Sequence, residues 1–175
     1  MRRLMLFRHA KAERPEGGQR DFDRALAPAG RAAAPRIGAY MAGHGLTPDL
    51  AICSSARRAK ETWDLAAEAY PVSPKTSYDK RIYELSAGGL LDLARKTAAG
   101  VHVLLLVGHN PSLEDLADML IATGDATERE RLEEKFPTGA LAVIDFSIDD
   151  WGALRPHSGR LDRLVTPADI GAGRN

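Results

Sequence analysis

Residues 102–111 read HVLLLVGHNP, and this stretch decides the fold. Residues 103–107 are an unbroken run of leucine and valine, which is typical of a strand that is buried on both faces of a sheet. Gly108 ends the run, and Pro111 suits the first position of a following helix. A doubly buried strand that leads directly into a helix predicts a parallel sheet covered by helices.

Working outward, other apolar runs and helical patterns alternate along the chain. Strands are expected at residues 4–8, 50–54 and 140–148, with a last strand near Leu154. Helices are expected at residues 30–43, 57–70, 90–98, after Pro111, and at 127–135, whereas residues 13–23 read as an exposed loop. Pro35 should lie in a first helical turn or cause a kink. This alternation predicts a three-layer α/β/α sandwich with a mostly parallel sheet.

Length and composition fit one domain over residues 1–175, with a core at about 3–166 and a loose polar tail from about Pro167. The 24 basic and 24 acidic residues cancel, so no global field favours nucleic acid or an anionic membrane as a partner. The only cysteine, Cys53, lies in an apolar run and reads as core. No segment is long enough for a signal peptide core or a membrane span, so a cytoplasmic location is expected.

Three predicted strand ends carry charged or titratable side chains: Arg8 and His9, the pair Arg57 and Arg58, and His109. Each alone is weak evidence, because a histidine in a loop or an arginine pair on a surface is common. In parallel sheets, however, ligands bind beyond the carboxyl ends of the strands. Two imidazoles and at least two guanidiniums at that edge suit a phosphoryl dianion, since arginine offers forked donors that match phosphate oxygens.

These segments also resemble a known family. Arg8-His9-Ala10 resembles the Arg-His-Gly signature of the histidine phosphatase superfamily, which includes the cofactor-dependent phosphoglycerate mutases. Residues 54–62 and 108–111 resemble its second motif and the segment around its second histidine, and residues 23–31 resemble the compact SixA-like branch of phosphohistidine phosphatases. The resemblance covers about residues 4–146 with the motifs in order, and it implies a phosphoglycerate mutase-like fold. Ala10 replaces the usual glycine, and Ala25 and Ser55 replace prolines.

The resemblance implies that His9 is the nucleophile and that Arg8, Arg58 and His109 form the phosphate pocket, with Asn110 beside it. The family's arginine precedes an alanine, which selects Arg58 over Arg57, and the second nitrogen of His9 should donate to a carbonyl or a carboxylate.

Glu84, in Tyr83-Glu84-Leu85, matches the proton donor of the mutase-like members, although not all compact members keep an acid. A protonated His109 and the arginines would stabilise the developing charge. No cofactor and no metal are expected.

The expected function is a metal-independent phosphatase that forms a covalent phosphohistidine on His9 and acts on phosphohistidine in a partner protein, such as a signalling protein. The short chain favours this substrate, because it leaves little material for a lid and predicts a shallow, open pocket. Three alternatives stay open: a phosphatase of small phosphorylated metabolites or sugars, a catalytically silent phosphate-binding module, and a metal-dependent hydrolase. His9 and His109 lack the paired ligand spacing of the last class.

Overall fold

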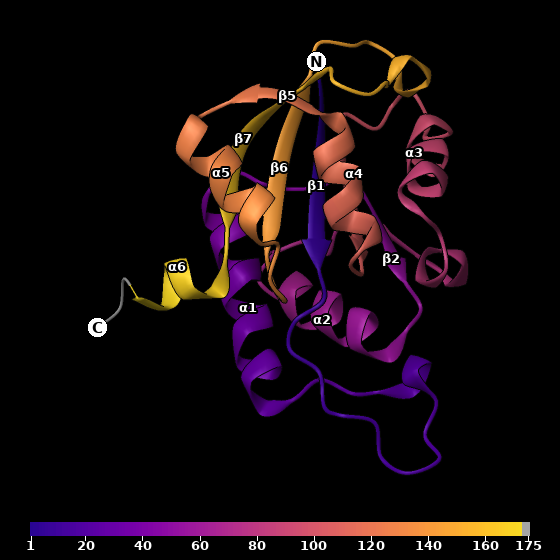
Figure 1. Cartoon of the computed structure of the whole chain (residues 1–175), viewed down its shortest axis with the longest axis vertical. Coiled ribbons are helices and arrows are strands. Elements are labelled where there is room, and N and C mark those ends of the chain that lie inside the picture. Colours follow the sequence, from indigo (N-terminus) through magenta and orange to yellow (C-terminus); the bar gives the residue numbers. More distant parts are fainter. Residues whose placement is uncertain (173–175) are drawn as a thin grey trace.

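A mixed sheet of seven strands forms the centre of the computed structural model, which describes residues 1–172 (Figure 1). The strand order is β3-β2-β4-β1-β6-β7-β5. The strands are β1 (Arg2–Arg8), β2 (Leu50–Ser54), β3 (Thr76–Asp79), β4 (Val103–Gly108), β5 (Ile121–Gly124), β6 (Leu141–Phe146) and β7 (Gly159–Val165). Within the described chain only β6 runs against its neighbours, so the prediction of a mostly parallel sheet is confirmed.

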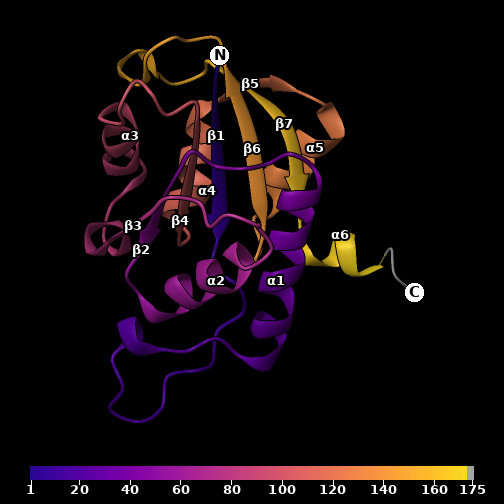
Figure 2. The ribbon, with the colours of Figure 1, turned by 180° about the vertical axis from the view of Figure 1, so that it is seen from behind.

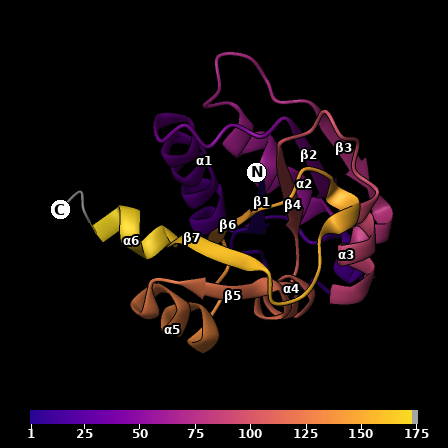
Figure 3. The same cartoon turned by 90° about the horizontal axis from the view of Figure 1, so that it is seen from above.

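Helices cover both faces of this sheet, as the view from above shows (Figure 3). The helices are α1 (Pro28–Gly43), α2 (Arg57–Ala67), α3 (Ala87–Arg95), α4 (Ser112–Leu120), α5 (Ala126–Glu134) and α6 (Pro167–Ala172), with short 3-10 turns η1 (Asp21–Asp23), η2 (Lys80–Tyr83) and η3 (Trp151–Ala153). α1 and α2 pack on one face, and α3, α4 and α5 pack on the other. The predicted three-layer α/β/α sandwich is therefore confirmed.

The apolar runs are continuous because both faces of the central strands are buried. In β1, Leu4 and Leu6 belong to the core under α3 and α4, whereas Met5 and Phe7 belong to the core under α1 and α2. Successive side chains of a strand point to opposite faces, so each residue of such a strand must be apolar. The adjacent strand β4 alternates in the same way between the two cores.

Two expectations about the C-terminal part are wrong. The last strand does not lie near Leu154, which follows the turn η3; it is β7, where Arg160, Asp162 and Arg163 interrupt the apolar pattern and hide the strand. The tail from Pro167 is not loose at its start, because α6 reaches Ala172. The rest of the expected tail, residues 173–175, lies outside the described residues. The single domain itself stays a prediction.

Other differences concern short or irregular elements. The four-residue strands β3 and β5 were not predicted, since each has too few residues to show a period. Of the two alternatives for Pro35, the first turn is excluded, because Pro35 lies inside α1 with its ring exposed to solvent. No helix in residues 1–172 is both long enough and apolar enough to span a bilayer.

The order of the strands places the site. β2, β4 and β1 are neighbours and run parallel, with Arg8 level with Gly108 and Cys53 level with Val107. Their carboxyl ends therefore meet at one edge of the sheet. α2, α4 and the long loop between β1 and α1 start from this edge, and the loop extends beyond the end of β1 (Figures 1 and 2).

Candidate active site

The edge formed by β1 and β4 brings the two predicted histidines together. The ring centroids of His9 and His109 are 5.3 Å apart, although 100 positions separate the residues in the chain. Each residue is only 7% exposed. The backbone N–H of His9 donates to the carbonyl of Gly108 at 3.0 Å, which fixes His9 relative to the end of β4. The expected convergence of the two imidazoles is thus present in the structure.

The ring of His9 is held in one orientation with its Nε2 atom facing the cluster. Its Nδ1 atom lies 2.7 Å from the carbonyl oxygen of Ala10, and since a carbonyl only accepts, Nδ1 carries the hydrogen and Nε2 the lone pair. Burial lowers the pKa of His9 to about 4. The hydrogen bond with Ala10 acts in the opposite direction, whereas the positive charges of Arg58 and Arg8 lower the pKa further. His9 is therefore neutral at pH 7. The expected carbonyl partner is found, and burial matters more than the arginines.

His109 is also neutral in the free site. Burial, followed by the proximity of His9 and Arg58, lowers its pKa to about 3, so His109 is neutral in the protein without a bound anion, and its protonation in the presence of a phosphoryl group stays a prediction. Its Nε2 atom shares a hydrogen bond of 2.8 Å with the hydroxyl of Ser54, at the end of β2. Its Nδ1 atom is buried without a hydrogen-bond partner among residues 1–172. A bound dianion would favour protonation of this ring.

Of the two neighbouring arginines, Arg58 belongs to the cluster. It is 5% exposed in the first turn of α2 and donates from Nε to Nε2 of His9 at 3.3 Å. Arg57 turns outward and pairs with Glu61. Consecutive residues of a helix point about 100° apart, so only one of the pair can face the strand ends.

Arg8 and Asn110 meet at one backbone carbonyl. Arg8 donates from Nη1 to the oxygen of Phe136 at 3.0 Å, and Asn110 donates from Nδ2 to the same oxygen at 2.9 Å. The Nε atom of Arg8 and the Oδ1 atom of Asn110 are buried and have no partner within residues 1–172. Burial lowers the pKa of Arg8, which reflects the electrostatic cost of removing a guanidinium from water.

Glu84 does not join this group of contacts. Its side chain is exposed at the end of η2 and forms no hydrogen bond or ion pair with any described residue. The neighbouring Tyr83 packs edge-on against His109, with ring centroids 5.4 Å apart. The role of Glu84 as a proton donor therefore stays a prediction.

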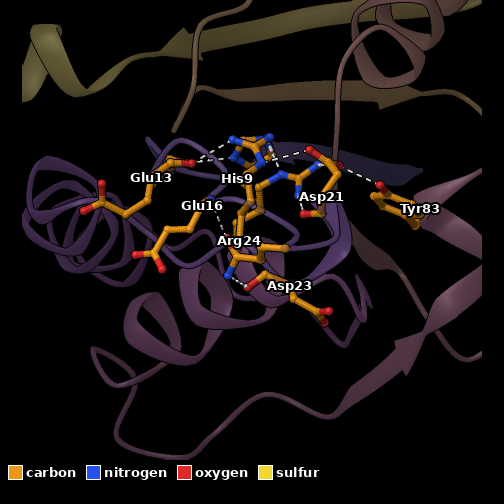
Figure 4. A network of polar contacts seen from close by, with 10 residues as sticks. His9, Glu13, Glu16, Asp21, Asp23, Arg24 and Tyr83 are labelled. Carbon is orange, nitrogen blue, oxygen red and sulfur yellow. Dashed lines mark hydrogen bonds and ion pairs between the residues drawn. The ribbon is translucent and has the colours of Figure 1, made fainter.

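Sequence reasoning missed Asp21, Tyr83 and Ser54. Asp21 accepts hydrogen bonds through Oδ2 from Nη2 of Arg58 at 3.0 Å and from the hydroxyl of Tyr83 at 2.6 Å. Figure 4 shows Asp21 between His9 and Tyr83. Asp21 lies in a loop rich in charges, and nothing in the local pattern distinguishes it from Asp23.

Acidic side chains line a hollow of about 280 Å³ between α4 and α5, which shares no residue with the histidine cluster. No three His, Cys, Asp or Glu side chains within residues 1–172 lie close enough together to hold a metal ion. The metal independence of the reaction stays a prediction.

Comparison with known proteins agrees with this geometry. Residues 4–110 match the family model of the histidine phosphatase superfamily (branch 1). An uncharacterized protein of Mycobacterium tuberculosis is 34% identical over 151 residues, which cover 85% of this chain and 92% of that protein.

Solved structures resemble the chain over almost its whole length. One, described provisionally as the phosphohistidine phosphatase SixA of Agrobacterium tumefaciens, is 32% identical with a TM-score of 0.79, and the match covers 95% of this chain and 99% of the other. Another, with the same provisional description and from Nakamurella multipartitia, is 26% identical with a TM-score of 0.82 over 95% and 96% of the two chains. The chain belongs to the histidine phosphatase superfamily and to its SixA-like branch, and this membership supports a phosphatase hydrolase.

Proposed function

We propose that this protein hydrolyses phosphohistidine in a partner protein through a covalent phosphoryl intermediate on Nε2 of His9. The observation that carries the proposal is the state of His9: a neutral imidazole whose Nδ1 is tied to Ala10, with the lone pair of Nε2 directed at a buried arginine. A nucleophile for phosphorus needs an unprotonated nitrogen and positive groups around the phosphoryl oxygens, and this cluster supplies both.

The phosphoryl oxygens have several donors available. Arg58 and Arg8 are the positive groups, and the unpartnered Nε of Arg8 supports a direct contact with one oxygen. The unpartnered Nδ1 of His109 would become a donor once the dianion protonates the ring. Asn110 would orient Arg8 through their shared contact with Phe136.

In the first step, Nε2 of His9 attacks phosphorus, the bond between phosphorus and the leaving nitrogen breaks, and the electron pair stays on that nitrogen. In the second step, a water oxygen attacks phosphorus, the bond to His9 breaks, and phosphate leaves while the water proton passes to solvent. The arginines stabilise the charge that spreads over the equatorial oxygens in both steps.

The state of the nearby acids supports a phosphorus–nitrogen substrate. The hydrogen bond from Tyr83, followed by the charge of Arg58, lowers the pKa of Asp21 to about 2, so Asp21 holds no proton to donate. An alkoxide leaving group needs a proton from the enzyme, whereas a phosphorylated imidazole can take its proton from water near neutral pH, because imidazole has a pKa of about 6.5. The cluster therefore suits phosphohistidine better than a sugar phosphate.

Trapping the adduct tests the reaction. The purified protein is incubated with phosphoramidate, a small phosphorus–nitrogen donor, quenched in alkali and examined by mass spectrometry of its peptides. We expect one phosphoryl group on His9, no adduct in His9→Ala, and a normal adduct in His102→Ala, which changes an exposed histidine. A wild-type turnover rate in His9→Ala would refute the mechanism.

Substrate class is tested separately. Rates are compared for a histidine-phosphorylated protein, phosphoramidate and an alkyl phosphate, with the wild type and Glu84→Gln. We expect the phosphohistidine protein to react fastest and Glu84→Gln to leave its rate within about two-fold. A preference for the alkyl phosphate, with a loss of about 10²–10⁴-fold in Glu84→Gln, would assign the protein to small phosphomonoesters and Glu84 to proton donation.

A further inference from the structure

Asp21 is the acidic residue that the long loop after β1 places against the cluster. Its Oδ2 atom accepts from Arg58 and from the hydroxyl of Tyr83, and its Oδ1 atom accepts from Nε of Arg24 at 2.8 Å. Its backbone carbonyl accepts a further hydrogen bond from Nη1 of Arg58 at 2.8 Å. Asp21 thus holds both terminal nitrogens of Arg58 at once.

The donors of Arg58 are divided between two directions. A guanidinium has five N–H groups. Two hydrogen bonds of Arg58 go from Nη1 and Nη2 to Asp21, and a third goes from Nε to His9. Because the terminal nitrogens are held by the loop, the Nε edge is the one presented to Nε2 of His9.

The residues around Asp21 are themselves anchored. Arg24 also donates to the carbonyl of Glu13 at 2.9 Å across the loop. The ring of Tyr83 packs edge-on against two other rings. Its centroid lies 5.0 Å from that of Phe22, and His109 is the second neighbour. Figure 4 shows this loop folded so that Asp21, Arg24 and Glu13 lie around His9. Because the carboxylate of Asp21 is held from several sides, we expect it to stay in place when a phosphoryl group binds. It would then support Arg58 and would not occupy the position of the phosphoryl oxygens.

We propose that Asp21, held by the hydroxyl of Tyr83, is a positioning residue that aims Nε of Arg58 at the phosphoryl group on Nε2 of His9. Asp21 acts through Arg58 and does not itself touch the substrate. The inference rests on the proposed function, because it assigns the role of Arg58 to phosphoryl transfer at His9.

A double-mutant cycle tests this role. The rate of His9 phosphorylation by phosphoramidate is measured in single turnovers for the wild type, Asp21→Ala, Arg58→Ala and the double variant. For the same four proteins, a second experiment measures the dissociation constant for tungstate, a tetrahedral oxyanion. Tyr83→Phe removes only the hydroxyl that holds Asp21. Asp23→Ala is the matched control, because Asp23 lies in the same turn and pairs with Arg20 instead. Melting temperatures check that each variant folds. If Arg58→Ala does not fold, Arg58→Lys replaces it in the cycle.

We expect Asp21→Ala to slow phosphorylation of His9 about 10- to 100-fold in the wild-type background, as expected for a lost charge-assisted hydrogen bond. In the Arg58→Ala background the same change should cost less than about two-fold, since a group that acts through Arg58 has nothing left to position. Tyr83→Phe should cost roughly five-fold, and Asp23→Ala should stay within about two-fold of the wild type.

Equal losses in both backgrounds, or no loss in the wild-type background, would overturn the proposal. A faster reaction in Asp21→Ala would overturn it as well, because Asp21 would then be a competitor of the substrate. If the wild type forms no adduct on His9, the proposed function has failed, and the tungstate cycle still decides whether Asp21 acts through Arg58. Additive losses of tungstate affinity would then reject the positioning role.

Discussion

The Nε atom of Arg58 lies 3.3 Å from Nε2 of His9, so the nitrogen proposed to attack phosphorus already faces a guanidinium donor. His9 directly follows the end of β1, and Arg58 lies in the first turn of α2, 49 positions later. The pair connects the proposed nucleophile with a guanidinium donor before any substrate arrives. Such prior orientation of donors is the main source of electrostatic catalysis.

This geometry predicts opposite results for two adjacent arginines. Arg58→Ala should lower kcat/KM about 10²–10³-fold, the usual effect of removing one donor to a developing oxyanion. Arg57→Ala should stay within about two-fold, because Arg57 forms an exposed pair with Glu61. Steady-state phosphate release from phosphoramidate measures both. Equal losses in the two variants would show that the wrong arginine is assigned to the site.

The two histidines predict how stability depends on pH. The pKa values of His9 and His109 are lowered to about 4 and 3, whereas both rings have a pKa of about 6.5 in the unfolded chain. Between pH 6.5 and 4 the unfolded chain therefore binds protons that the native protein does not. The free energy of unfolding is highest above pH 6.5 and should fall below it with a slope that approaches about 2.7 kcal/mol for each pH unit, about 1.4 kcal/mol for each of the two protons.

Urea unfolding at pH 7, 6 and 5 measures this slope. The variant in which His9 and His109 are both replaced by Gln should lose most of it, because glutamine does not titrate. If the wild type and this variant show the same slope, other groups control acid stability and the two histidines are not buried as neutral rings.

The hydrogen bond between Ser54 and His109 predicts a third effect. Ser54→Ala leaves Nε2 of His109 without its partner and frees the ring to turn, so activity should fall roughly 10-fold, equivalent to the loss of one hydrogen bond. Ser55→Ala is the control, since Ser55 is the neighbouring residue and its hydroxyl contacts none of the cluster residues named above. Rates of phosphoramidate hydrolysis compare the two. An unchanged rate in Ser54→Ala would mean that His109 is held by its packing alone.

The contact between α1 and α2 predicts a change in stability without a change in chemistry. A Cβ added at Gly38 would lie 2.1 Å from the carbonyl oxygen of Ala66, so Gly38→Ala must push the two helices apart and should cost about 1–3 kcal/mol. Gly43→Ala, near the end of the same helix, meets no atom within 4 Å and should be neutral or slightly stabilising. Urea unfolding at pH 7 measures both. A Gly38→Ala protein as stable as the wild type would contradict this close approach.

The sequence by itself determined the layers and most of the predicted site. The apolar runs at β1 and β4 are continuous because each must fill two cores, and that requirement is visible residue by residue. The motifs with His9, Arg58 and His109 follow strands or open helices, so their place at one edge of a parallel sheet could be inferred from topology. β7 was missed because its partly exposed charges mask the strand pattern.

Only the tertiary structure decided the protonation of His109 and the participation of Asp21, Tyr83 and Ser54. A lowered pKa depends on how completely a ring is removed from water and on which charges surround it, and neither is written in the neighbouring residues. Asp21 and Asp23 are alike in local sequence, and only the path of the loop beyond the end of β1 brings one of them to Arg58. The periodicity of a sequence indicates which face of a helix or strand is buried, whereas contacts between loops that are distant in the sequence form only when the whole chain folds.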